Sequence, residues 1–389
     1  MKKSQLFGLL AALTAVVIFT GCPTDPDIEY RDKIVEKEKI VEKDKIIDND
    51  VMIHIDTLAE NQAGLVAALA NPAYEDKVIG YDGSTALASE SVTIGEKYAV
   101  YILNGGDLAT GSGAGLTVEG TLWVGYGAAL TVGDSSEPIV VDGGVVNVVT
   151  GGTLSIDSAD SIQDAEGETA LGTAAVSIVN GKLAYTDGSG FDTTTKIAAA
   201  LGYITSGTLD VGEVELKPSE VTGITIPQNK SLIANTGDTD ETATTLIIPA
   251  GLVLTTGDDL DSVTELTVYG TLTASSATLK SDGAALTVGA NGSASIGAAT
   301  LLTSTVEGSL TLNGDLTLDT DAVLTITAQA ELSGSDKIIA AAGTITIVAE
   351  GVSYEGFTTD DTGVAADDFW TVAEALQADL NALTGDKTA

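Results

Sequence analysis

Clustered carboxylates are the residues whose type and spacing come nearest to catalytic chemistry in this chain. Asp258 and Asp259 directly follow Gly257, and a pair of carboxylates can act as acid and base in glycoside hydrolysis. The same run is also ordinary turn chemistry, because short acidic side chains accept hydrogen bonds from nearby backbone N–H groups. Both interpretations stay open at these positions.

Carboxylate oxygens are also the ligands that Ca²⁺ prefers, and two acidic clusters are weak candidates for such a site. One cluster contains Asp238, Asp240 and Glu241, and the other contains Asp258, Asp259 and Asp261. Neither matches the loop of an EF-hand or the Gly-rich nonapeptide calcium repeat. Solvated loops are the simpler interpretation, so we predict no metal and no cofactor.

The residues that would complete an active site are scarce. His54 is the only histidine, so it has no partner for a histidine metal site or a catalytic triad, and we expect it to pack or lie at the surface. From residue 51 onward the chain has nine lysines, no arginine and 46 acidic residues. We therefore predict that the protein is not an enzyme. We also predict no nucleic-acid binding, which requires basic residues to replace counterions.

Two aromatic residues support a binding hypothesis. Trp123 lies between Leu122 and Val124, and because side chains alternate along a strand it should point outward. With Tyr126 it could form a platform on which a sugar ring stacks. The alternative is that both are isolated surface aromatics with no ligand.

These candidates must be positioned by short strands, whose pattern is clearest over residues 264–327. Apolar triplets such as Leu266-Thr267-Val268 recur there between turn residues, with two apolar side chains on one face and a threonine on the other. Successive strands begin six to eight residues apart, so every third strand begins about 20 to 24 residues later. This spacing predicts an all-β fold, a parallel three-sided β-solenoid with short capping helices.

The outward threonines of these triplets could align into a flat ladder similar to that of ice-binding solenoids. Threonine is also simply a favourable residue at a solvent-facing strand position. The positions concerned are Thr117, Thr131, Thr267, Thr287, Thr311, Thr317 and Thr325.

The body resembles the right-handed parallel β-helix of pectate-lyase-like proteins. In that family the resemblance would imply a basic proton abstractor in lyases, or paired aspartates with a Gly-His-Gly and an Arg-Ile-Lys element in polygalacturonases. Gly257-Asp258-Asp259 matches only the aspartate pair, and the other elements are absent. The resemblance therefore implies the fold and not the activity.

Helix signals divide the body into two solenoid units, residues 51–190 and 191–366, followed by a capping helix at 367–389. Thr57 to Glu60 reads as a capping box for a first helix, Asp192 to Thr195 as the cap of a second, and Thr371 to Glu374 as that of the third. Motif pairs such as Leu116 to Leu122 and Leu266 to Leu272 suggest an internal duplication.

The N-terminus resembles the signal peptide of bacterial lipoproteins. Residues 1–21 combine a basic start with a short apolar run, and the run ends in Phe19-Thr20-Gly21-Cys22, which is similar to a lipobox of the relaxed spirochaete type. The resemblance implies that Cys22 carries acyl chains, such as palmitate, and inserts them into a membrane. Pro23 favours the outer membrane or cell surface over the inner membrane.

Residues 22–50 form a charged spacer with a six-residue period, seen in Lys33 to Glu38 and Lys39 to Asp44. The period matches neither a heptad nor a surface helix, so we expect a solvated tether, with a self-associating stalk as the alternative. Together these features predict an exported, membrane-anchored, acidic, non-catalytic envelope protein that acts as a display or adhesion scaffold. Its partners would be a glycan, host matrix or another envelope component. The alternative is a carbohydrate-active enzyme or a glycan-binding module.

Overall fold

The computed structural model describes most of the body of the chain. The described residues are 45–48, 51–84, 86–87, 91–111, 113–132, 137–237, 241–257, 260–276, 278–279, 283–340, 342–349, 352–357 and 362–375. The chain divides into the units Met1–Glu42 and Lys43–Ala389. The expected signal peptide, Cys22 and most of the expected tether lie outside the described residues.

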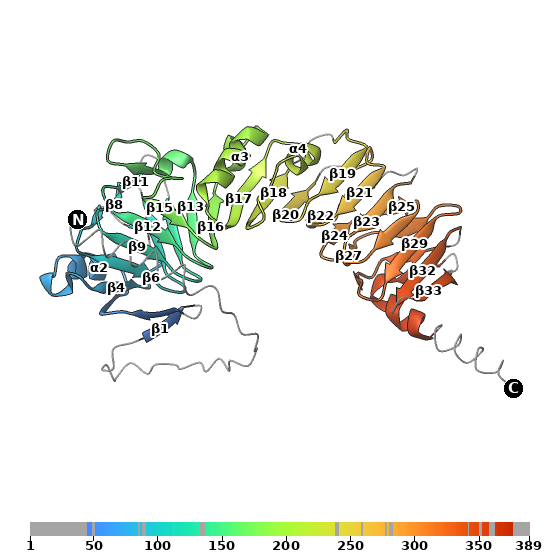
Figure 1. Cartoon of the computed structure of the whole chain (residues 1–389), viewed down its shortest axis with the longest axis horizontal. Helices are drawn as coiled ribbons and strands as arrows, with labels where there is room; N and C mark the ends of the chain where they lie inside the picture. Colours follow the sequence, from blue (N-terminus) through green and yellow to red (C-terminus); the bar gives the residue numbers. More distant parts are fainter. Residues whose placement is uncertain are drawn as a thin grey trace. The chain divides into compact units, whose positions relative to one another are not determined.

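The body is built mostly from strands in long parallel sheets with few helices. Within the described residues, one eleven-stranded sheet, here called the long sheet, continues through the body, as Figure 1 shows from β13 to β27. Its strands are β7 (Asp107–Thr110), β10 (Ala129–Val132), β13 (Thr153–Ile156), β16 (Gly181–Tyr185), β17 (Gly207–Val214), β18 (Lys230–Thr236), β20 (Leu252–Thr256), β22 (Thr271–Ala274), β24 (Ser293–Ile296), β27 (Ser309–Leu312) and β30 (Glu331–Ser333).

Two further sheets accompany the N-terminal half of the long sheet. Among the described residues, the six-stranded sheet contains β3 (Thr57–Ala59), β4 (Val78–Tyr81), β6 (Ala99–Ile102), β9 (Thr121–Val124), β12 (Val145–Val148) and β15 (Val176–Ile178). The β5–β14 sheet contains β5 (Val92–Ile94), β8 (Leu116–Val118), β11 (Ile139–Val141) and β14 (Ile162–Asp164).

Two other sheets accompany the C-terminal half of the long sheet. In the described part of the chain, the seven-stranded sheet contains β19 (Thr245–Ile248), β21 (Glu265–Val268), β23 (Ala285–Val288), β26 (Ser304–Val306), β29 (Val323–Thr327), β32 (Thr344–Ala349) and β33 (Val352–Phe357). The β25–β34 sheet contains β25 (Ala299–Leu301), β28 (Leu316–Leu318), β31 (Lys337–Ile339) and β34 (Val364–Ala365).

The chain visits the three sheets of each half in turn, and we call one such passage a coil. Strands β7, β8 and β9 belong to three different sheets, and β10, β11 and β12 return to the same sheets in the same order with parallel pairing. The topology is consistent with the predicted all-β parallel solenoid. Coil lengths vary more than the predicted 20 to 24 residues, from the interval between Ala294 and Leu310 to that between Val146 and Val176.

Aliphatic side chains from successive coils stack inside the sheets. In β21, Leu266 and Val268 are buried while Thr267 between them is half-buried and faces outward. Leu266 pairs in register with Leu286, and Thr267 with Thr287, so each kind of side chain continues along the sheet. The predicted alternation of inward aliphatics and outward threonines is confirmed at these strands.

Helices interrupt the coils where the two expected units meet. Helix α3 (Thr194–Tyr203) follows β16 and α4 (Pro218–Thr222) follows β17, and both replace strands of the shorter sheets. Ile197 and Leu201 of α3 are buried, as predicted for the second helix. Because β16 pairs in parallel with β17, the long sheet continues across residues 190 and 191.

The first helix begins later than the sequence predicted. Thr57 lies in β3 and pairs with Ile79, so its capping box is wrong, and α2 (Gln62–Leu69) begins after Asn61. The Asn61 side chain caps this helix by accepting a hydrogen bond of 2.9 Å from Gly64 N. Thr57 thus pairs with a neighbouring strand instead of capping a helix.

The duplication motifs occupy different places in the fold. Leu116–Val118 forms β8 of the β5–β14 sheet, whereas the matching Leu266 to Val268 lies in β21 of the seven-stranded sheet. Their shared feature is the glycine after the strand. A β-carbon would lie 2.3 Å from Tyr98 O at Gly120 and 2.4 Å from Leu252 O at Gly270, so both tight corners exclude side chains.

The C-terminal end of the sheets is closed by antiparallel strands and a helix. Strand β33 pairs antiparallel with β32, and β34 with β31. Residues 369–375 are helical, two residues earlier than the predicted Thr371 cap, and Phe369 is completely buried. Residues 376–389 of the expected capping helix lie outside the described residues.

The described part of the chain begins with two antiparallel strands. Strands β1 (Lys45–Asp48) and β2 (Val51–His54) pair antiparallel, so the last repeat of the expected tether forms a strand. In the described part of the chain, no helix is both long enough and apolar enough to cross a bilayer.

Candidate functional site

A pocket opens beside α3, where the six-stranded sheet and the β5–β14 sheet reach their last strands. Its volume is about 240 Å³. The walls come from residues 157–159 before β14, from the end of β16 and the loop after it, and from one face of α3. The side chains that matter for binding are Tyr185, Phe191, Tyr203, Asp157, Asp187 and Lys196.

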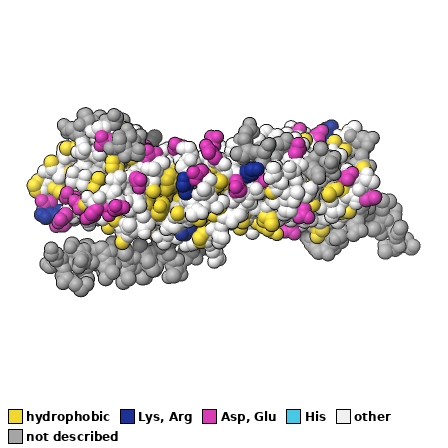
Figure 2. Space-filling model, turned by 90° about the horizontal axis from the view of Figure 1, so that it is seen from above, with side chains coloured by type: hydrophobic (Ala, Val, Ile, Leu, Met, Phe, Trp, Pro, Cys, Tyr) yellow, Lys and Arg dark blue, Asp and Glu magenta, His cyan; other side chains and the backbone are white. Residues whose placement is uncertain are grey.

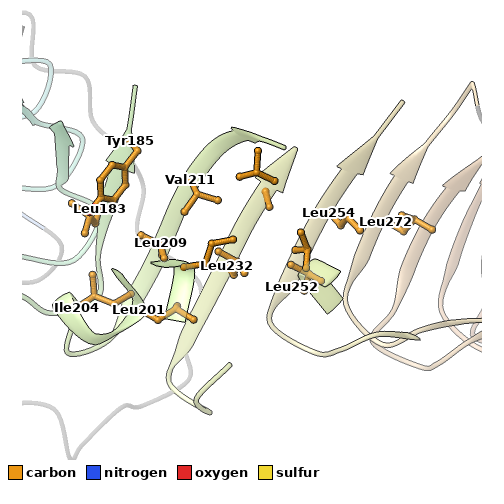
Figure 3. Packing of buried hydrophobic residues seen from close by; sticks show 14 of the residues in the cluster. Leu183, Tyr185, Leu201, Ile204, Leu209, Val211, Leu232, Leu252, Leu254 and Leu272 are labelled. Carbon is orange, nitrogen blue, oxygen red and sulfur yellow. The ribbon is translucent and has the colours of Figure 1, made fainter. Parts of the chain in front are cut away.

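Aromatic rings form the inner part of this pocket. Tyr185 and Phe191 are 7% and 6% exposed, and their rings meet edge to face with centroids 4.6 Å apart. Tyr185 is the last residue of β16 and lies above Leu183, on the side toward Val211 of β17 (Figure 3). Burial, with a smaller contribution from Tyr203, raises the pKa of Tyr185, so its hydroxyl stays protonated.

Two carboxylates, the exposed Asp187 and the half-buried Asp157, also line the pocket, and neighbouring groups hold them in place. Asp187 caps the short helix after β16 by accepting a hydrogen bond of 2.9 Å from Ser189 N, and this bond lowers the pKa of Asp187. Asp157 accepts a hydrogen bond from Ser161 Oγ. Asp187 therefore presents a negative charge in a fixed position at neutral pH.

The positive charge in the pocket wall is already paired. Lys196 Nζ lies 2.9 Å from Oδ1 of Asp192, which precedes α3 by two residues, and both side chains are about half exposed. Such exposed pairs contribute little to stability. The pair leaves the pocket with more negative than positive charge.

Sequence reasoning did not select this pocket. Three of its lining residues, Tyr185, Phe191 and Tyr203, fall within 19 positions of a chain in which only 4% of residues are aromatic. That concentration was the available signal. It could not show that the three rings line one pocket, because this depends on how α3 returns Tyr203 to the end of β16.

Trp123 faces outward, as its alternation predicted, but it is half-buried in a small hydrophobic cluster. It pairs in register with Tyr101 of the neighbouring strand. Tyr101, Ile55 and Leu103 are buried there, and Trp123 and Val78 pack against them. Part of the indole therefore serves packing outside the six-stranded sheet.

Tyr126 is 47% exposed and lies in the turn after β9. Its ring lies against Gly151, in the equivalent turn of the next coil. The contacts of Trp123 and Tyr126 thus involve different neighbours, and a shared platform for a sugar ring stays a prediction.

Of the six carboxylate candidates, only Glu241 and Asp261 lie within the described residues. Asp238, Asp240, Asp258 and Asp259 lie outside those residues, while Asp261 is exposed. Within the described chain, no group of three or more His, Cys, Asp or Glu residues could hold a metal ion. His54 is exposed, with Nε2 3.5 Å from Asp56 Oδ1.

Glu241 has a structural role that its sequence context did not indicate. It is 4% exposed and accepts hydrogen bonds from Ser219 N, Ser219 Oγ and Ala243 N at 2.8, 2.9 and 2.7 Å. Burial opposes ionisation of Glu241, but these hydrogen bonds together outweigh it and lower its pKa. The carboxylate ties α4 to the segment that precedes β19.

The outward threonines do not form one ladder, because they lie on four different sheets. Three of them, Thr267, Thr287 and Thr325, do align on the seven-stranded sheet. Thr305 and Thr346 complete the same row, which we call the threonine row. Neighbouring members are about 4.8 Å apart, the spacing of adjacent strands.

No family model matches the chain, and no curated protein or solved structure matches it significantly. The surface gives a complementary view of its chemistry. Acidic side chains are scattered over the face seen in Figure 2, with few lysines among them. The formal net charge of the whole sequence is −39.

Proposed function

We propose that this protein is a non-catalytic, lipid-anchored envelope or surface protein that acts as a display or adhesion scaffold. The observation that supports it best is the regular outward surface of the parallel sheets. The threonine row on one sheet has a counterpart on the long sheet, where Thr273, Ser295, Thr311 and Ser333 follow in register. Such rows offer a repeating, uncharged set of hydroxyl groups.

We also propose that the sheets wind as a right-handed β-solenoid of the pectate-lyase-like kind. The parallel register and the regular return to the same sheets support this assignment. A scaffold of this design lengthens by adding coils, because each coil contacts only its neighbours. It would hold a binding surface away from the membrane at the end of the tether.

The anchor is the part of the proposal that is tested first. Cells grown with an alkyne fatty acid should label the wild-type protein and a Thr24→Ser control, while Cys22→Ser abolishes labelling. Protease shaving of intact cells should then remove the body if it lies at the cell surface. Labelling that survives in Cys22→Ser would contradict the anchor.

Adhesion is tested separately with the mature protein on arrays of glycans, host-matrix proteins and envelope components. Binding should not require catalytic turnover, and reversible retention on at least one class is expected. Absence of binding across the whole array would remove adhesion from the proposal and leave display alone.

A glycan-binding module is a second candidate, favoured by the exposed ring of Tyr126 and the half-exposed indole of Trp123. Because part of the indole packs against Tyr101, Trp123→Ala should lower thermal stability. If the indole is also a stacking surface, glycan binding should be lost at temperatures at which the variant is still folded. A carbohydrate-active enzyme is the other alternative, and it requires activity that disappears in Asp258→Asn or Asp259→Asn.

A further inference from the structure

We infer that the pocket beside α3 binds a small organic ammonium ion. The inference concerns the body of the protein and does not depend on the proposed anchor or on adhesion. Three properties of the pocket lead to it: aromatic rings that line it, carboxylates held in its wall, and a lysine that is already paired.

The rings supply the first part of the recognition. Tyr185, Phe191 and Tyr203 line a space of about 240 Å³, which is large enough for a substituted ammonium group. Aromatic faces carry negative electrostatic potential and attract such a cation at short range. Because Tyr185 and Phe191 are nearly buried and pack edge to face, their positions are fixed before any ligand enters.

The carboxylates supply the charge. Asp187 accepts a hydrogen bond from Ser189 N, and Asp157 accepts one from Ser161 Oγ. These bonds fix the orientation of both carboxyl groups. A cation in the pocket would meet these carboxylates together with the aromatic rings of the same wall. A protein that carries a formal charge of −39 also attracts cations from a distance.

Other ligand classes fit the same walls less well. An anion would be repelled by Asp157 and Asp187. A neutral sugar could use the hydroxyls of Tyr185 and Tyr203, but it would leave the negative charge of Asp187 unbalanced. No group of three metal-binding side chains is present among the described residues, which disfavours a bare metal ion.

The experiment is an NMR titration of the whole mature protein with tetramethylammonium chloride. tert-Butanol, a neutral molecule of similar size, and methyl β-glucoside are titrated in parallel at the same ionic strength. Shifts confined to residues around the pocket, with a dissociation constant on the order of millimolar, are expected for the ammonium ion. The two neutral molecules should bind at least several-fold more weakly.

Charge variants of opposite sign give the sharpest comparison. Asp187→Asn should weaken ammonium binding about threefold, and Lys196→Gln should strengthen it about two- to threefold, as expected for exposed charges. Asp142→Asn and Lys97→Gln are matched controls, because Asp142 is exposed outside the pocket and Lys97 forms an exposed pair with Glu75. Neither control should change affinity.

Tyr203→Leu tests the aromatic contribution while keeping an apolar side chain in α3. It should weaken ammonium binding about two- to fivefold, with the folded state verified by the unchanged NMR spectrum away from α3. The inference is overturned if tert-butanol or the glucoside binds as well as tetramethylammonium. It is also overturned if Lys196→Gln and Asp187→Asn change affinity in the same direction or not at all.

Discussion

The ring of Tyr126 lies against the backbone of Gly151 in the next coil, so that a β-carbon on Gly151 would be 2.4 Å from Tyr126 Cδ2. Gly151 also has φ +74°, a conformation that favours glycine. We expect Gly151→Ala to lower the free energy of unfolding by about 2–4 kcal/mol, from backbone strain plus overpacking. Chemical denaturation measures this loss.

Gly143→Ala is the matched control for that prediction. Gly143 has the same φ of +74°, but a β-carbon there would meet no atom within 4 Å. It should therefore cost only the backbone strain, about 1–2 kcal/mol. Adding Tyr126→Ala to Gly151→Ala should recover the difference, and equal losses in the two single variants would contradict the contact.

The inward stacking of aliphatics predicts a large asymmetry between neighbours in β21. Leu266 is 1% exposed and Thr267 faces outward. Leu266→Ala should destabilise the protein by about 2–5 kcal/mol because it leaves a cavity, whereas Thr267→Ala should cost less than about 1 kcal/mol. Similar losses for the two variants would indicate that the assigned faces are wrong.

Glu241 predicts a specific dependence of stability on pH. Because the folded state lowers the pKa of Glu241, its contribution is present above the ordinary pKa of glutamate and is lost as the pH falls through the folded value. Glu241→Gln should cost about 1–3 kcal/mol at pH 7, since its amide would oppose a backbone donor. The difference from wild type should shrink below about pH 4.

Glu307→Gln is the control for that measurement, because Glu307 lies at an exposed turn. Its unfolding free energy should stay within about 0.5 kcal/mol of wild type at every pH. A constant gap between Glu241→Gln and wild type from pH 7 to pH 3 would show that the ionised carboxylate is not what stabilises α4.

Much of the fold follows from the period of its strands, because alternation within a triplet decides which side chains are buried. Leu266, Thr267 and Val268 could be assigned to their faces from the sequence alone. What the pattern cannot specify is the sheet to which a triplet belongs. Strands of different sheets can have the same sequence pattern, an apolar triplet followed by a glycine in a tight corner. Gly120 and Gly270 therefore follow matching triplets that belong to different sheets.

The pocket beside α3 could not be predicted for a related reason. Its residues come from three segments, 157–159, 185–191 and 196–203. These segments meet because the chain forms α3 between β16 and β17, where other coils have strands of the shorter sheets. The sequence predicted α3 through Ile197 and Leu201, which mark its buried face. The direction in which Tyr203 and Lys196 point depends on how that helix packs, and periodicity alone does not contain this information.

The closing helix predicts how the C-terminal end of the body unfolds. Phe369 is completely buried, its ring lies edge to face with Trp370 at 5.2 Å, and Trp370 Nε1 donates to Ala330 O at 3.1 Å beside β30. Phe369→Ala removes the buried ring and should destabilise this end by about 3–5 kcal/mol.

Hydrogen exchange of β30 and β31 should accelerate strongly in this variant, while that of β7 and β10 stays unchanged, because each coil depends mainly on its neighbours. Trp370→Phe loses the hydrogen bond and part of the half-buried indole, and it should give the same pattern with a smaller cost of about 1–2 kcal/mol. Uniform acceleration across all strands in Phe369→Ala would instead mean that the body unfolds as one cooperative unit.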